Sequence, residues 1–144
     1  MMCEHYKETG MKSNLDKLFK TDESLETKGV WFVIDAENGV EILLKRYGGS
    51  NAKSIQAALA KYMKPYAHQI QNGTLDQKKS LEIGVKIFVD SCVIDWKGIE
   101  IDGQEVPFTI EAANKLFLSL PELFRTLEKY CSDVENYKEE LGNS

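Results

Sequence analysis

Few residues in this sequence combine the side-chain types and the spacing that catalysis or metal binding requires. Cys3 and His5 are metal-ligand types, but a zinc site needs a second pair of ligands, and the sequence offers none at suitable spacing. A nucleophile needs a base within reach, and only His68 is available for that role. Because no serine or cysteine lies in a recognisable nucleophile elbow, we expect no catalytic residue and no metal site.

Pairs of acidic residues remain as candidates for acid–base chemistry by residue type alone. Asp90 with Asp95, and Asp102 with Glu105, lie close in the sequence. A turn accounts for Asp102, and the solvent face of a hairpin accounts for Glu105. The run Gly48-Gly49-Ser50-Asn51 fits a turn and a helix cap, and no GxxxxGK(S/T) or GxGxxG pattern accompanies it. We predict that the protein is not an enzyme and needs no cofactor.

Composition limits the class of protein and its compartment. A chain of 144 residues with 42% hydrophobic and 28% charged residues suits one soluble globular domain. The net charge of −5 argues against nucleic acid as a partner, because such surfaces need a basic patch. Three widely spaced cysteines favour a reducing compartment. Without an apolar run of membrane-spanning length or a signal segment, we expect no membrane partner and a cytoplasmic location.

Hydrophobic periodicity and turn residues predict an α+β fold, namely a mainly helical single domain of about four helices with two short β-hairpins. The first hairpin spans residues 29–47 and turns at Asn38-Gly39, and the second turns at Asp102-Gly103. The first helical pattern covers residues 52–72, where Pro65 predicts either a kink near residues 61–64 or two abutting helices. Further helical patterns cover residues 77–96, after a capping box that begins at Thr74, and two segments that begin after Thr109 and at Pro121.

The domain boundaries follow the apolar pattern. We place the single domain at residues 14–141, a variable or disordered N-terminal extension at 1–13, and a C-terminal tail at 142–144. Near the start of the domain, Leu15, Leu18 and Phe19 have the spacing of one helical turn, which we expect to dock on the rest of the domain.

The segment from residue 87 to residue 108 is the one around which we expect the other elements to pack. Its apolar helical run ends at Trp96, and the second hairpin follows at once. We expect the Trp96 indole to pin the junction between helix and hairpin. The predicted structural hub therefore consists of Trp96, Gly98, Gly103 and Pro107.

Two surfaces each allow two interpretations. Residues 30–35 carry large apolar side chains on both faces, and the outer face is either covered by the N-terminal segment or left for a partner. The most basic part of the chain surrounds the 52–72 helix and is either a solvated face or a surface that docks an acidic partner segment. Its residues are Lys45, Arg46, Lys53, Lys61 and Lys64.

Several different short motifs follow one another along the chain from about Asn14 onward. They are Gly29-Val30-Trp31-Phe32, Arg46-Tyr47-Gly48-Gly49-Ser50, Lys64-Pro65-Tyr66, Asn72-Gly73-Thr74, the block from Asp95 to Pro107, and Leu120-Pro121-Glu122-Leu123-Phe124. In this order the sequence resembles the tail assembly chaperones of long-tailed bacteriophages and prophages. The resemblance implies a non-catalytic protein of the bacterial host cytoplasm, absent from the mature virion, that binds the tape measure protein, keeps it soluble and helps recruit the major tail protein.

A protein with this role needs adaptable apolar contact area, and enough charge to keep its complex soluble. The resemblance also implies a further partner, a longer form of the chain that is made by −1 frameshifting. It is compatible with homo-oligomers of the chain. The alternative function is a structural virion component, such as a head–tail connector or tail accessory protein. For contact with a partner we select Trp31, Val33, Tyr62, Met63, Tyr66, Glu128 and Glu135.

Overall fold

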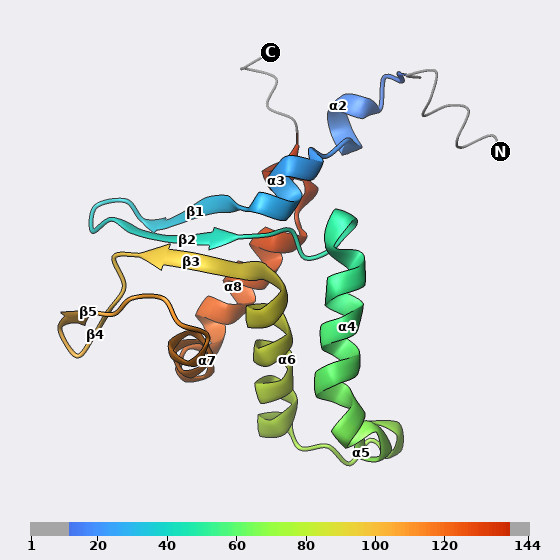
Figure 1. Ribbon diagram of the computed structural model, residues 1–144, viewed down its shortest axis with the longest axis vertical. Helices are drawn as coiled ribbons and strands as arrows, with labels where there is room; N and C mark the ends of the chain where they lie inside the picture. The colour runs from blue at the N-terminus through green and yellow to red at the C-terminus, as the bar shows by residue number, and fades with distance from the viewer. Residues whose placement is uncertain (1–11, 139–144) are drawn as a thin grey trace.

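The structure, a computed structural model, describes residues 12–138 and has the mainly helical α+β fold that the sequence predicts (Figure 1). Most of the predicted N-terminal extension and the whole predicted tail at 142–144 lie outside the described residues. No helix within residues 12–138 is long and apolar enough to cross a membrane.

Helices surround two small antiparallel sheets. The first half of the chain forms α2 (Asp16–Phe19), α3 (Glu23–Lys28), β1 (Val30–Asp35), β2 (Val40–Leu44), the 3-10 helix η1 (Gly49–Asn51), α4 (Ala52–Met63), η2 (Lys64–Tyr66) and α5 (Ala67–Asn72). The second half forms α6 (Gln77–Cys92), β3 (Val93–Lys97), β4 (Glu100–Ile101), β5 (Gln104–Glu105), α7 (Ile110–Ser119), α8 (Pro121–Ser132) and η3 (Val134–Tyr137). The larger sheet has the strand order β1-β2-β3, and β4 pairs with β5.

One face of the three-stranded sheet is packed against helices. Ile42 and Leu44 of β2 lie beside Trp96 and Val93 of β3 in the strand register, and all four side chains are buried. Helix α8 crosses behind the sheet in Figure 1, and its Tyr130 ring stacks on Phe32 of β1 with 4.1 Å between ring centroids. This burial of apolar side chains from sheet and helix is the main stabilising contribution to the fold.

Helix α6 lies at the centre of the molecule, as its two apolar faces predict. It packs against α4 on one side and against α7 on another. The fully buried ring of Phe88 lies in edge or tilted contact with the rings of Tyr47, Phe117 and Phe124. The cysteines of this core, Cys92 and Cys131, are free and buried.

The prediction that this helix continues to Trp96 is wrong. Helix α6 ends at Cys92, and residues 93–97 form strand β3, which pairs with β2. A short apolar run does not distinguish helix from strand by periodicity alone. Here the β-branched Val93 and Ile94 and the aromatic Trp96 suit a strand, and hydrogen bonding to β2 stabilises it.

The interruption predicted at Pro65 is confirmed. Helix α4 ends at Met63, the 3-10 turn η2 contains Pro65, and α5 follows. Proline lacks the N–H that an α-helix needs at this position, so the chain turns at the corner between α4 and α5. The cap of α6 differs from the prediction, because the Asp76 carboxylate, rather than Thr74, accepts the hydrogen bond from the Lys79 N–H.

The N-terminal turn is helical, but it does not dock as predicted. Leu15, Leu18 and Phe19 are 53%, 52% and 66% exposed, so their side chains gain little from burial. The chain is held instead by backbone pairing, since Thr21 forms an isolated bridge with Lys138.

The second hairpin has the predicted turn. Asp102 and Gly103 both have positive φ, 55° and 79°, as this two-residue turn requires. The hub residue Trp96 lies in strand β3, and its indole N–H donates a 2.7 Å hydrogen bond to the Val106 carbonyl beyond the hairpin. Gly98 also has positive φ and lies against the backbone of Gly39 in the first hairpin. Pro107, the other hub residue, is exposed.

Candidate partner-binding surfaces

The outer face of the three-stranded sheet is the first candidate surface, and we call it the open sheet face. Strand alternation places Trp31 and Val33 of β1 and Leu43 of β2 on the face opposite the buried residues. Ile94 of β3 joins them, because its Cδ1 and that of Leu43 lie within 3.2 Å of the position that a Cβ on Gly29 would take. Val33 is 49% exposed. Within residues 12–138 no helix crosses this face (Figure 1).

Charged residues of both signs lie on the open sheet face beside the apolar ones. The ammonium group of Lys97 lies 4.1 Å from the centroid of the Trp31 ring, a cation–π contact. Glu41 lies between Val33 and Lys97 in the strand register, and Asp95 lies opposite Leu43. The open sheet face therefore mixes apolar side chains with charges of both signs.

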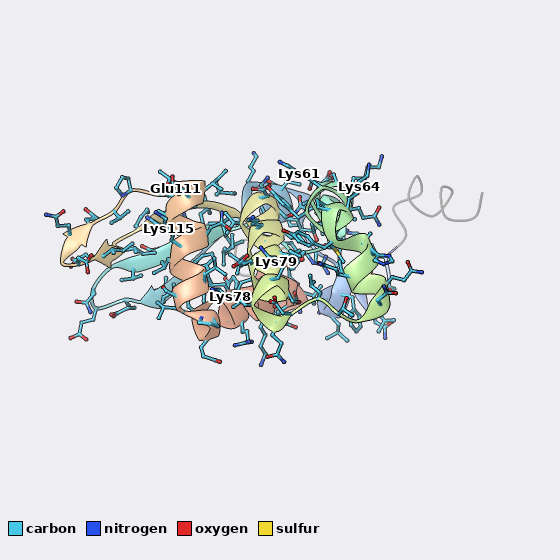
Figure 2. The ribbon with its side chains drawn as sticks, turned by 90° about the horizontal axis from the view of Figure 1, so that it is seen from below. Lys61, Lys64, Lys78, Lys79, Glu111 and Lys115 are labelled. Atoms are coloured by element: carbon cyan, nitrogen blue, oxygen red, sulfur yellow. The ribbon has the colours of Figure 1, made fainter. Side chains whose placement is uncertain are left out.

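The second candidate surface lies where α4, η2 and α6 meet, and we call it the lysine-rimmed groove. Its lining includes the apolar parts of Tyr62, Tyr66 and Ile83, with Lys61, Lys79 and Lys86 around them. Figure 2 looks onto this end of the molecule and shows Lys61 and Lys64 beside Lys78 and Lys79.

The hollows at this corner are too small for a typical ligand. The lysine-rimmed groove has a volume of about 160 Å³, and a neighbouring hollow of about 270 Å³ shares Ile83 and is lined by Met63, Ile70 and Leu75. Small-molecule pockets usually measure about 300–1,000 Å³. These shapes suit the side chains of a partner protein better than an enclosed substrate.

Hydrogen bonding fixes part of the groove. The Tyr62 hydroxyl donates to the Asp90 carboxylate on α6, and this hydrogen bond raises the pKa of Tyr62, with burial adding to it. Across the groove, Lys79 pairs with Glu82 at 2.9 Å. This hydrogen bond lowers the pKa of Glu82, and the charges of Lys78 and Lys86 lower it further. Because Asp90 accepts the hydrogen bond from Tyr62, it has a structural role in the groove.

The two acidic residues selected from the last helix lie in different surroundings. Glu128 of α8 is half-buried, and burial raises the pKa of its carboxyl group. Glu135 of η3 is exposed and accepts a hydrogen bond from the Lys138 ammonium group at 3.0 Å. Glu135, whose side chain is 65% exposed, is therefore more accessible to a partner than Glu128 is.

The remaining candidates for chemistry do not converge. In the described range, no group of three His, Cys, Asp or Glu side chains is close enough to hold a metal ion. His68 lies 3.1 Å from the Asn72 amide, and Asp102 and Glu105 are exposed in the second hairpin. Cys3 and His5 lie outside the described residues.

A family model described as YdaY prophage protein matches residues 50–143, which is most of the chain. The chain belongs to the YdaY prophage protein family. It is therefore a phage or prophage protein, as the sequence resemblance implies at this coarser level. No curated protein and no solved structure matches the sequence.

The family match covers one of the two surfaces of this YdaY family member. The lysine-rimmed groove lies wholly within residues 50–143, whereas Trp31 and Val33 of the open sheet face precede the matched segment. The YdaY family segment thus contains the helical half of the fold together with β3 and the second hairpin.

The structure groups the selected residues into the two surfaces. Trp31 and Val33 share the open sheet face, whereas Tyr62, Met63 and Tyr66 line the two hollows at the helical corner. Sequence reasoning missed the α6 lysines of the groove because they lie on a different helix from Lys61 and Lys64. It also counted Arg46 as part of a basic surface, whereas its guanidinium pairs with Glu26.

Proposed function

We propose that this prophage protein is a non-catalytic tail assembly chaperone. It binds the tape measure protein in the bacterial cytoplasm, keeps it soluble and helps recruit the major tail protein during assembly of the tail tube. The finished virion would not contain it. The ordered sequence motifs and the membership of a prophage family support this proposal.

The observation that carries the proposal is the open sheet face. Trp31, Leu43 and Ile94 form a half-buried apolar patch, and Val33 beside them is 49% exposed. Such a face, left without a covering helix in residues 12–138, supports the proposal of a protein interaction site here. A chaperone that keeps an apolar rod soluble needs contact area of this kind, together with the net charge of −5 that the chain carries.

Co-expression with the tape measure protein of the same prophage tests the proposal. We expect the tape measure protein to be soluble, and to co-elute with this chain, only when the chain is present. An unrelated acidic protein of similar size controls for nonspecific solubilisation. Insoluble tape measure protein with nothing co-eluting would contradict the proposal. Recovery of this chain in purified virions by mass spectrometry would instead favour the alternative, a structural virion component.

A further inference from the structure

Five lysines gather at one end of a chain whose net charge is −5. Lys61 and Lys64 come from the end of α4 and from η2, and Lys78 and Lys79 come from the start of α6 (Figure 2). Lys86 of α6 lines the same groove. Of these five lysines, only Lys79 forms an ion pair with a residue in the described range, namely with Glu82. The other four lysines form no ion pair within residues 12–138, although the charges of Lys78 and Lys86 lie close enough to Glu82 to lower its pKa. Because the five lysines outnumber the carboxylates of Glu82 and Asp90, positive charge predominates locally although the whole molecule is acidic.

The lysines surround an apolar floor rather than a flat polar surface. Tyr62 and Tyr66 lie one helical turn apart on the α4–η2 corner and face Ile83 of α6 across the groove. The ammonium groups of Lys61 and Lys79 lie 5.0 Å and 5.5 Å from the centroids of the Tyr62 and Tyr66 rings. A groove with an apolar floor and one sign of charge along its edges matches a helix with an apolar stripe and flanking charges of the opposite sign.

We infer that the lysine-rimmed groove holds an acidic amphipathic helical segment of the client protein. This inference rests on the proposed function, because the client it describes is the tape measure protein. Leu or Ile side chains of the segment would lie on Tyr62, Tyr66 and Ile83, and its Asp and Glu side chains would face the lysines. The client would then be held at two places, the open sheet face and this groove.

Charge complementarity favours this occupant over nucleic acid. Glu82 and Asp90 lie among the lysines, so an occupant must place its negative charges away from these two carboxylates. An acidic helix can place its carboxylates over the lysines and its apolar side chains over the floor, whereas a nucleic acid has no aliphatic side chains for that floor.

A charge-reversal variant of the groove tests the inference. The variant K61E/K64E/K86E leaves the Lys79–Glu82 pair intact, and all three of its positions are exposed. The matched control K28E/K53E/K129E makes the same change in net charge at exposed positions outside the groove. Both are co-expressed with the tape measure protein, and circular dichroism checks that both fold. We expect the groove variant to bind the client about tenfold more weakly, and the control to bind as wild type does.

Salt dependence and a peptide scan complete the test. Raising the salt concentration from about 0.1 M to 1 M shortens the Debye length from about 10 Å to 3 Å. This change should weaken client binding by the wild type more than client binding by the groove variant. Overlapping peptides of the tape measure protein, titrated by fluorescence anisotropy, should place binding in an acidic amphipathic segment.

The outcomes separate this inference from the proposed function. If the wild type binds no tape measure protein, the proposed function fails and the inference fails with it. If the wild type and the groove variant bind the client equally, only the inference is overturned. Two further results would overturn the inference, because each would show another occupant of the groove. One is tighter binding of a single-stranded oligonucleotide than of any peptide. The other is salt-sensitive self-association that the groove variant loses.

Discussion

The carboxylate of Glu26 and the guanidinium group of Arg46 form a partly buried ion pair, 2.5 Å long, that joins α3 to the segment after β2. The Glu26 side chain is only 3% exposed, and it also accepts hydrogen bonds from the hydroxyl and N–H of Ser50. The amide of Asn51 donates to the backbone carbonyls of both Glu26 and Arg46. This network fixes the entry into helix α4, on which the lysine-rimmed groove depends.

Removing the charge of Glu26 should destabilise the fold. Breaking a buried ion pair on one side leaves the other charge without its partner and costs about 3 kcal/mol or more. We therefore expect Glu26→Gln to lower the free energy of unfolding by about 3 kcal/mol at pH 7, measured by urea denaturation. Glu122→Gln is the control, because the Glu122–Arg125 pair is exposed and should contribute less than about 1 kcal/mol.

The pH dependence of this effect has a definite sign. Burial alone would raise the pKa of Glu26, but hydrogen bonds from Ser50 and Arg46 outweigh it and hold the pKa below 4.5. The unfolded chain therefore binds more protons in this range, so the stabilisation is present above pH 4.5 and is lost as the pH falls through the lowered pKa. The difference between wild type and Glu26→Gln should shrink on acidification, and a difference that is unchanged at acidic pH would contradict this account.

Glu128 should show the opposite sign. Burial raises the pKa of its carboxyl group above 4.5, and the charge of Arg125 only partly offsets this. The folded chain then binds more protons than the unfolded chain, so stability falls as the pH rises through the raised pKa. We expect Glu128→Gln to unfold at a higher temperature than wild type at pH 7, and to lose this advantage below pH 4.5. A lower unfolding temperature at pH 7 would contradict the prediction.

Local signals in the sequence predict the turns and helices well, because they act over a few residues. Asn38-Gly39 and Asp102-Gly103 each mark a real turn, and Pro65 marks a real interruption. Strand β3 escapes prediction because pairing with β2, about fifty residues earlier in the sequence, decides between helix and strand.

The two candidate surfaces are harder to predict than strand β3, because they depend even more on contacts between residues that are distant in the sequence. Nothing near Glu26 in the sequence indicates that Arg46 and Ser50, 20 and 24 positions away along the chain, will bury its carboxylate. The lysines of α6 likewise join Lys61 only because α4 and α6 pack side by side. Sequence patterns could select Tyr62 and Met63 individually, but not the groove and the hollow in which they lie.

Gly98 should tolerate alanine far less well than Gly103 does. Both have positive φ, but a Cβ on Gly98 would lie 2.3 Å from the Gly39 carbonyl oxygen, whereas one on Gly103 would have no neighbour within 4 Å. We expect Gly103→Ala to cost about 1 kcal/mol from its backbone conformation alone. Gly98→Ala should cost roughly 3 kcal/mol because the two hairpins must also move apart. Equal costs in chemical denaturation would show that the close approach does not matter.

The Trp96 indole should hold the second hairpin against the sheet. Trp96→Phe keeps an aromatic ring in contact with Phe108 but loses the hydrogen bond to the Val106 carbonyl. We expect a loss of about 1–2 kcal/mol and faster hydrogen exchange at the Val106 N–H, which donates to the Ile99 carbonyl. Trp31→Phe, on the open sheet face, should change stability by less than about 0.5 kcal/mol. Unchanged exchange at Val106 would contradict this role.

The open sheet face should bind the client through Trp31 and Val33 if the proposed function is correct. Replacing both with serine removes apolar contact area from an exposed face, and a tryptophan at the centre of an interface often contributes about 2 kcal/mol or more. We expect Trp31→Ser/Val33→Ser to lower the recovery of soluble tape measure protein about tenfold or more in the co-expression assay.

A control of matched chemistry separates this effect from a general loss of apolar surface. Ile110→Ser/Leu120→Ser removes two side chains that are 55% and 49% exposed at the ends of α7, away from the sheet face. This control should keep the wild-type recovery of client, and thermal unfolding should show that both double variants are folded. If the sheet-face variant recovers as much client as wild type does, the client binds elsewhere, and Trp31 and Val33 are not its contacts.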